Sequence, residues 1–295
     1  GGVNIIDHSK AIAAQANYYG DVWQDLYVEQ KLNILTSALP VASILTLAAT
    51  GSEMNGNSVI SNMHTNQKLA IGHDLLRPVF SILDPEYTFT VNQYHTAAGV
   101  VDILSHLFEQ YFTPDQEGYL QNRLMEAMMK TVIEYWPIAY NQLDDYEARA
   151  NLMWTSSLAL NGMVTYGKVS TDWATHGMEH ELSAFYDITH GVGLGILTPY
   201  WMKYVLSEEN VHRFVEYGKN VWNLDGENNM EIANKAINKT REFFSSLGIP
   251  STLKEVGIDE SKLDKMAEQA TMFGALGSMK KLYKEDVLAI YKMAL

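Results

Sequence analysis

Three of the nine histidines of this chain lie in the segment WATHGMEHELSAFYDITH, residues 173–190. His176 and His180 are four residues apart, so in a helix both imidazoles project from the same face. His190 begins the next apolar, glycine-punctuated run, and a turn through 186–187 would bring it back to the pair. Imidazole is a common ligand of zinc and iron and a general acid or base near neutral pH. The segment therefore predicts a metal site or a proton-transferring site.

A second pair at helical spacing, Asp102 and His106, adds a carboxylate. On this helix alone the pair is also typical of an ordinary solvated stripe. Together with His176 and His190, or with His180 in place of one of them, it forms a nitrogen and oxygen set suited to a divalent transition metal. The spacing alone does not decide between His180 and His190.

Composition excludes several classes of protein. The chain has 295 residues and no cysteine, so His, Asp and Glu are its only strong metal ligands. Its net charge of −14 argues against nucleic-acid binding, and no apolar run is long enough to span a membrane. Without a signal-like amino terminus, the expected location is cytoplasmic. Gly177 occupies the place of the catalytic Glu in an HExxH motif, which disfavours a metalloprotease.

The predicted secondary structure changes near residue 90, from mixed helix and strand to helix alone. A helix is predicted over 7–19, shortly after a pair of glycines at the start of the sequence. The β-branched runs follow at 41–48, 58–63, 68–72 and 78–85. The polar turn 50–53 comes after the first run, where an α/β sheet often binds its ligand. We therefore expect an α/β domain over 1–90 and an all-helical domain over 91–295. The helices expected in the second domain span 91–112, 117–140, 145–165, 172–184, 190–205, 208–223, 228–247, 259–272 and 284–294.

Several motifs together resemble one known family. They are Gly1 to Asp7 with Lys10 to Ala13 in the place of a glycine-rich phosphate loop and its helix, ATGSE at 49–53, LDPEYT at 83–88, the Asp102 and His106 pair, and the three-histidine block. In this combination the chain is similar to the iron-dependent (group III) alcohol dehydrogenases, in their butanol dehydrogenase and aldehyde reductase branch. The resemblance covers essentially the whole sequence. It implies a dehydroquinate synthase-like fold: an α/β remnant of a dinucleotide-binding domain followed by an all-α helical metal-binding domain.

The resemblance also implies roles for particular residues. Fe²⁺ or Zn²⁺ would be held by Asp102, His106, His176 and His190, which leaves His180 as a catalytic, proton-relaying residue. NAD or NADP would lie between the two domains. The implied cofactor contacts are Gly1, Gly2, Asn4, Asp7, Thr46, Thr50, Ser52, Asn55, Lys68 and Tyr87.

The activity that the resemblance implies is hydride transfer between NAD(P)H and a small aliphatic aldehyde or primary alcohol such as butanol, by a homodimer. Val3 and Asn4 depart from the family's phosphate loop, and the first part of its nucleotide-binding domain has no counterpart in the sequence. We expect either a piece of a longer enzyme or a shortened homologue, with slow turnover or none by the chain as it stands. The alternatives are a redox-inactive binding protein that keeps the metal site and a metal-dependent hydrolase.

Overall fold

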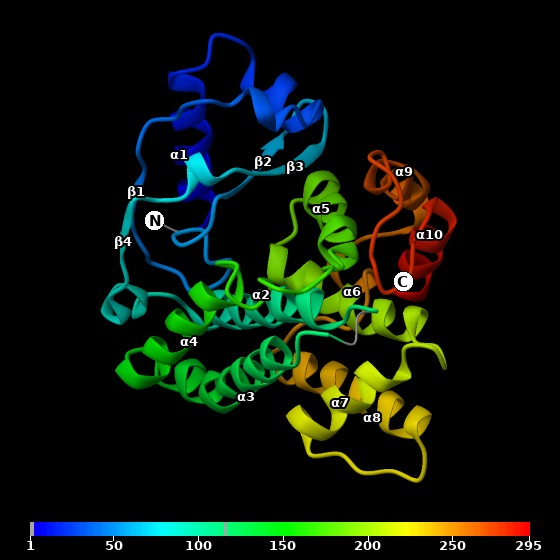
Figure 1. Ribbon diagram of the computed structural model, residues 1–295. Helices are drawn as coiled ribbons and strands as arrows, with labels where there is room; N and C mark the ends of the chain where they lie inside the picture. The colour runs from blue at the N-terminus through cyan, green and yellow to red at the C-terminus, as the bar shows by residue number, and fades with distance from the viewer. Residues whose placement is uncertain (1–2, 115–116) are drawn as a thin grey trace.

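The computed structural model of the protein describes residues 3–114 and 117–295 (Figure 1). Its first part contains helix α1 (Val3–Ala16) and four short strands, β1 (Ala42–Ile44), β2 (Asn57–Asn62), β3 (Gln67–Gly72) and β4 (Phe80–Ile82). Strand β1 pairs in parallel with β4, and β2 pairs antiparallel with β3. The parallel strands β1 and β4 lie within their predicted β-branched runs and are only three residues long. Strands β2 and β3 each begin one residue before their predicted runs.

Helix α1 differs from its predicted bounds, because it begins at Val3 and not at Asp7, and ends at Ala16 and not at Tyr19. Ile6 is buried and packs with Leu45, which follows β1. This contact between distant parts of the chain outweighs the modest helix propensity of β-branched residues. Asn4 consequently lies within the helix and not before it.

The chain beyond residue 91 is helical, as predicted. Its helices are α2 (Gln93–Tyr111), α3 (Tyr119–Asn141), α4 (Tyr146–Ala159), α5 (Ala174–Tyr186), α6 (His190–Val205), α7 (Val211–Trp222), α8 (Asn229–Ser246), α9 (Leu263–Ala270) and α10 (Lys284–Met293). The prediction for α4 was too long: the helix stops at Ala159, and Gly162 soon afterwards takes a φ of +99°. A left-handed glycine is typical of a chain that has left its helix.

Short helical turns complete the described elements. They are η1 (Trp23–Val28), η2 (Leu32–Ile34), η3 (Asp74–Leu76), η4 (Pro85–Thr88), η5 (Lys254–Val256) and η6 (Glu260–Lys262). None of the helices in the described part of the chain combines the length and the apolar character needed to cross a membrane.

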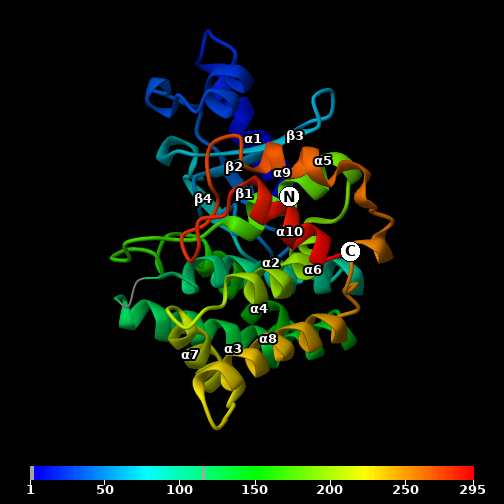
Figure 2. The same ribbon diagram turned by 90° about the vertical axis from the view of Figure 1, so that its right-hand side faces the viewer.

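Helix α2 forms the centre of the molecule, since every residue from Thr96 to Tyr111 is buried. Helices α3, α4 and α6 pack around it, while α1 and the strands gather on one side with β2 and β3 next to α5 (Figures 1 and 2). Helix α6 approaches α2 very closely at Gly191, where an added Cβ would lie 2.0 Å from the carbonyl oxygen of Ala98. Only glycine allows this contact, which places the first residue of α6, His190, beside α2.

Candidate metal centre

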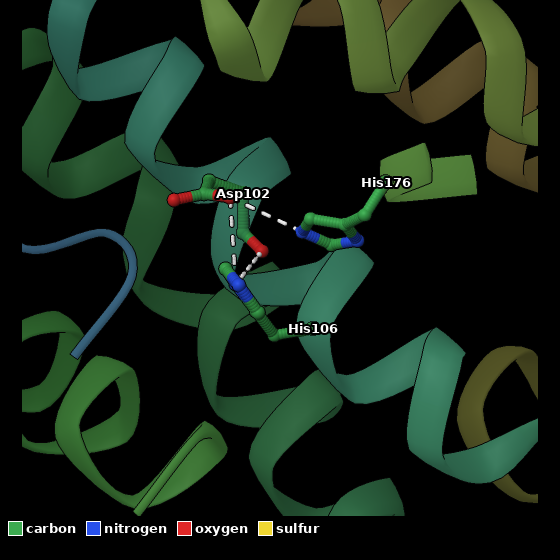
Figure 3. Close-up of side chains that lie close together, drawn as sticks. All are labelled: Asp102, His106 and His176. Atoms are coloured by element: carbon green, nitrogen blue, oxygen red, sulfur yellow. Dashed lines mark hydrogen bonds and ion pairs between the residues drawn. The ribbon is translucent and has the colours of Figure 1, made fainter. Parts of the chain in front are cut away.

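Four side chains predicted as metal ligands meet where α2, α5 and α6 come together. Asp102 and His106 lie one turn apart on α2, His176 lies in the first turn of α5, and His190 is the first residue of α6. The Oδ1 atom of Asp102 is 3.4 Å from Nδ1 of His106 and 3.9 Å from Nε2 of His176 (Figure 3). The same oxygen is 3.6 Å from Nε2 of His190. The predicted turn before α6 is present, with Asp187 in the left-handed conformation.

Two of these imidazoles are oriented by an oxygen at Nδ1. In His106 this nitrogen lies 2.8 Å from the backbone oxygen of Asp102, and in His176 it lies 3.0 Å from Oε1 of Glu109. An oxygen acceptor at Nδ1 favours the tautomer that carries its proton there, which leaves the Nε2 lone pair free. This is the arrangement that metal-ligating histidines usually adopt.

Burial keeps the rings of His106 and His176 in the neutral form that can bind a metal. It lowers the pKa of His106 to about 4 and that of His176 to about 4, so both are neutral near pH 7, as a metal ligand must be. Among the described residues, Asp102 Oδ1 and His176 Nε2 are buried atoms without a hydrogen-bond partner. Buried polar atoms normally have partners, and a cation between these two would satisfy both. The nitrogen and oxygen donor set fits Fe²⁺ or Zn²⁺.

Glu109 was not predicted as a functional residue, yet it holds the start of α5. Trp173, the residue before the helix, has a φ of 65° and makes no side-chain cap. Oε1 of Glu109 accepts a hydrogen bond from the backbone N–H of His176 at 2.8 Å, as well as contacting its ring. Glu109 therefore satisfies a free N–H of the helix terminus and orients the His176 ring at the same time. Its position on the same face of α2 as Asp102 and His106 was the signal in the sequence.

Lys68 and Glu179 lie on the side of the site that contains His190. Lys68 was predicted as a cofactor contact, which stays a prediction. In the structure its Nζ atom lies 3.0 Å from Oγ of Ser183 and 3.4 Å from Oε2 of Glu179. Oε2 of Glu179 also contacts Nδ1 of His190 closely. The Glu179 carboxylate thus orients His190 in the way that Glu109 orients His176. No pattern in the sequence indicated Glu179.

The polar turn after β1 reaches the same site. Oγ1 of Thr50 donates a hydrogen bond of 2.7 Å to Oδ2 of Asp102. Thr50 was predicted as a cofactor contact, which stays a prediction, and in the structure its hydroxyl orients the carboxylate of Asp102 on α2. A hydrogen bond to a carboxylate is one of the stronger side-chain interactions in a protein, so this turn is fixed to the centre of the helical part.

Three other predicted cofactor contacts are buried in an internal network. Asp7, Ser52 and Asn55 are each at most 3% exposed. Lys10, which is fully buried, donates from Nζ to Ser52 O at 2.7 Å and to Asn55 O at 3.0 Å. Ser52 Oγ donates to Asp7 Oδ1 at 2.5 Å. These side chains join α1 to the turn after β1. Their contact with a cofactor stays a prediction.

The remaining predicted contacts are more accessible. Asn4 and Tyr87 are exposed and Thr46 is half-buried, while Gly1 and Gly2 lie outside the described residues. The first turn of α1 carries no acidic side chain. A carboxylate there would repel an anion bound at the amino terminus of the helix.

His180, predicted as a catalytic residue, lies on α5 beside the predicted metal ligands His176 and His190. Its ring centroid is 5.7 Å from that of His190, and burial lowers its pKa well below the usual range. Possible ligand atoms of Glu179, His180 and His190 lie within 4.8 Å of one another, as do those of Asp102, His106 and His176. The two clusters are adjacent, because the ring centroids of His176 and His190 lie 5.4 Å apart.

Comparison with known proteins identifies the family. Residues 96–295 match the model of the Fe-containing alcohol dehydrogenase family, C-terminal, and residues 1–85 match that of iron-containing alcohol dehydrogenase. The chain belongs to the iron-containing alcohol dehydrogenase family. It is thus an oxidoreductase of the alcohol dehydrogenase type, and the family resemblance noted in the sequence is confirmed.

Members of this iron-containing family from several bacteria are similar to the chain along nearly all of its length. It is 56% identical to NADH-dependent butanol dehydrogenase A of Clostridium acetobutylicum over 99% of the chain and 75% of the relative. It is 37% identical to NADPH-dependent aldehyde reductase YqhD of Escherichia coli over 93% of the chain and 70% of the relative. The crystal structure of NADH-dependent butanol dehydrogenase A from Thermotoga maritima matches with a TM-score of 0.93 and 37% identity, over 99% of the chain and 75% of the relative. This similarity confirms the predicted fold class.

Proposed function

We propose that the protein transfers a hydride between a nicotinamide and a small aliphatic aldehyde or primary alcohol, at a metal ion held by Asp102, His106, His176 and His190. The observation that carries the proposal is the convergence of one carboxylate and three imidazoles, with Asp102 Oδ1 and His176 Nε2 buried and without partners in the described structure. A divalent ion held there would act as a Lewis acid on the substrate oxygen. NADH or NADPH would supply the hydride in aldehyde reduction and NAD⁺ or NADP⁺ would accept it in the reverse direction.

Side chains next to the proposed ligands orient them and supply a group for proton transfer. Glu109 and Thr50 orient ligands on two sides of the site, at 3.0 Å from His176 and 2.7 Å from Asp102. His180 lies next to the ligands on the same helical face as His176, so its imidazole is the group that we assign to proton transfer between the substrate oxygen and solvent. Burial lowers the pKa of His180, so the ring is neutral near pH 7.

We further propose two domains, 1–90 and 91–295, with the dinucleotide between them. All four proposed ligands belong to the second part, whereas Thr50 and Lys68 extend from the first part to the site. The first turn of α1, which has no acidic side chain, is the proposed pyrophosphate position. A homodimer remains a prediction, to be tested by light scattering of the purified protein.

The named relatives support an oxidoreductase over the two alternatives. NADH-dependent butanol dehydrogenases A and B of Clostridium acetobutylicum are 56% and 53% identical to the chain. These names favour butanal and butanol as the first substrates to test, and NADH as the first cofactor. Neither the hydrolase nor the redox-inactive binding protein has comparable support.

The test is turnover of the purified chain before and after metal removal. Protein stripped with a chelator and reloaded with Fe²⁺ or Zn²⁺ is mixed with butanal and NADH or NADPH, and nicotinamide absorbance is followed. Metal-dependent oxidation of the nicotinamide is expected. Metal-dependent hydrolysis of an ester with no nicotinamide oxidation would overturn the proposal. Metal binding with neither reaction, and with no NADH or NADPH binding by nicotinamide fluorescence, would favour the binding-protein alternative.

A further inference from the structure

The Glu179 carboxylate is shared by residues from both parts of the chain. Its side chain is fully buried, and Oε1 accepts a hydrogen bond from Ser183 Oγ at 2.5 Å. Oε2 contacts Nδ1 of His190 and lies 3.4 Å from Nζ of Lys68. Helix α6 leaves space for this side chain, because a Cβ at Gly193 would lie only 2.8 Å from Cγ of Glu179.

The chemistry of the two nitrogens makes Glu179 the link between them. If His190 binds a metal through Nε2, its Nδ1 carries a proton and is a donor. The ammonium of Lys68 is also only a donor, so these nitrogens, 3.3 Å apart, do not hydrogen-bond to each other in that state. Both need an acceptor, and Oε2 of Glu179 lies next to both.

We propose that Glu179 is a positioning residue that links metal binding at His190 to the order of the β2–β3 hairpin, residues 57–72. Lys68 is part of β3, where it pairs with Ser61 of β2. The same hairpin is held at its turn by Gln269, whose Nε2 donates to the backbone oxygen of Asn66 at 2.7 Å. The first part of the chain also contacts the hairpin, for example through Asp7 Oδ2, which accepts from Val59 N, and through the hydroxyl groups of Tyr27 and Ser58. The Lys68 contact is the attachment that leads, through Glu179, to a proposed metal ligand. The inference rests on the proposed metal site.

A cation bound at Nε2 makes the proton on Nδ1 of His190 more acidic and so strengthens its hydrogen bond to Glu179. The carboxylate is then fixed where it holds Lys68 and, through Lys68, strand β3. Coupling of this kind is reciprocal, so a well-ordered hairpin also favours metal binding.

The experiment measures hydrogen exchange of the hairpin amides in metal-free protein and in protein saturated with Zn²⁺. Zinc should slow exchange across 57–72 by about fivefold or more, the lower end of ordinary coupling between sites. With Glu179→Gln this effect should be lost even at saturating Zn²⁺, and zinc affinity should fall by about 10 to 100-fold. With Lys68→Met, which leaves Glu179 in place, zinc should bind but no longer protect the hairpin.

Glu181→Gln is the matched control, because Glu181 is also a buried carboxyl on α5 but is not one of the groups contacting His190. It should behave as the unaltered protein does. Circular dichroism checks that each variant is folded, and Lys68→Met keeps the test open if Glu179→Gln does not fold. Zinc protection of the hairpin that survives in a folded Glu179→Gln or in Lys68→Met would overturn this inference alone. Absence of zinc binding by the unaltered protein would overturn the proposed metal site together with it.

Discussion

Replacing Thr50 by Val tests whether the turn after β1 serves the metal or the cofactor. The substitution keeps the shape of the side chain and removes the 2.7 Å hydrogen bond to Oδ2 of Asp102. Asp102 Oδ1, the atom facing the three imidazoles, would then be free to rotate away from them. A hydrogen bond to a charged group contributes about 1.5 to 3 kcal/mol. Since about 1.4 kcal/mol corresponds to a tenfold change in affinity, the expected loss of metal affinity is about 10 to 100-fold.

The assay titrates metal-free protein with Zn²⁺ in competition with a coloured chelator, and NADH binding is measured separately by nicotinamide fluorescence. The comparison variant is Thr46→Val, an equally conservative change at another predicted cofactor contact in the same segment. Thr50→Val should weaken zinc binding while Thr46→Val leaves it intact. If Thr50→Val weakened NADH binding and left zinc affinity unchanged, the assignment of Thr50 to the metal side would be refuted.

Three further predictions concern individual side chains. His176→Ala and His190→Ala should each release the metal, and elemental analysis showing undiminished metal in either variant would remove that residue from the ligand set. His180→Ala should keep its metal and lose turnover by on the order of 10²-fold, and an unchanged rate would show that the ring is scaffolding. Burial lowers the pKa of Lys10 to about 8, whereas a lysine in the unfolded chain has a pKa of about 10.4. Between these two pH values the unfolded state binds more protons than the folded state. The free energy of unfolding therefore rises with pH in this range. Relative to Lys10→Met, the free energy of unfolding should therefore increase by about 2 kcal/mol between about pH 8 and pH 10, and a constant difference in urea denaturation would contradict the burial argument.

The helical pairs and the order of elements could be read from the sequence because both depend on local periodicity. Asp102 and His106 share a face of one helix, and so do His176 and His180, whatever the rest of the fold does. Whether His180 or His190 completes the ligand set depends on how α6 packs against α2, which no local pattern contains. The family resemblance supplied that choice, and the described structure places His190 Nε2 near Asp102 Oδ1.

The groups that orient the ligands were harder to predict. Glu109 could have been found, since it continues the face of α2 that carries Asp102 and His106. The contact between Lys68 and Glu179 joins residues 111 positions apart, and it exists only because the β2–β3 hairpin packs on α5. The start of α1 was misplaced for a similar reason, because burial of Ile6 against a distant strand extends the helix toward the amino terminus.

The close contact at Gly191 also limits how this protein can vary. A methyl group there would lie 2.0 Å from Ala98 O, whereas ordinary contacts begin near 3.4 Å, so the two helices would have to separate by more than about 1 Å. Metal–ligand distances tolerate only about 0.2 Å. A single-codon change from glycine to alanine, at a residue that binds nothing, should therefore abolish the site as completely as loss of His190. In a mutational library, Gly191 has to be held constant along with the ligands, although its side chain has no chemistry of its own.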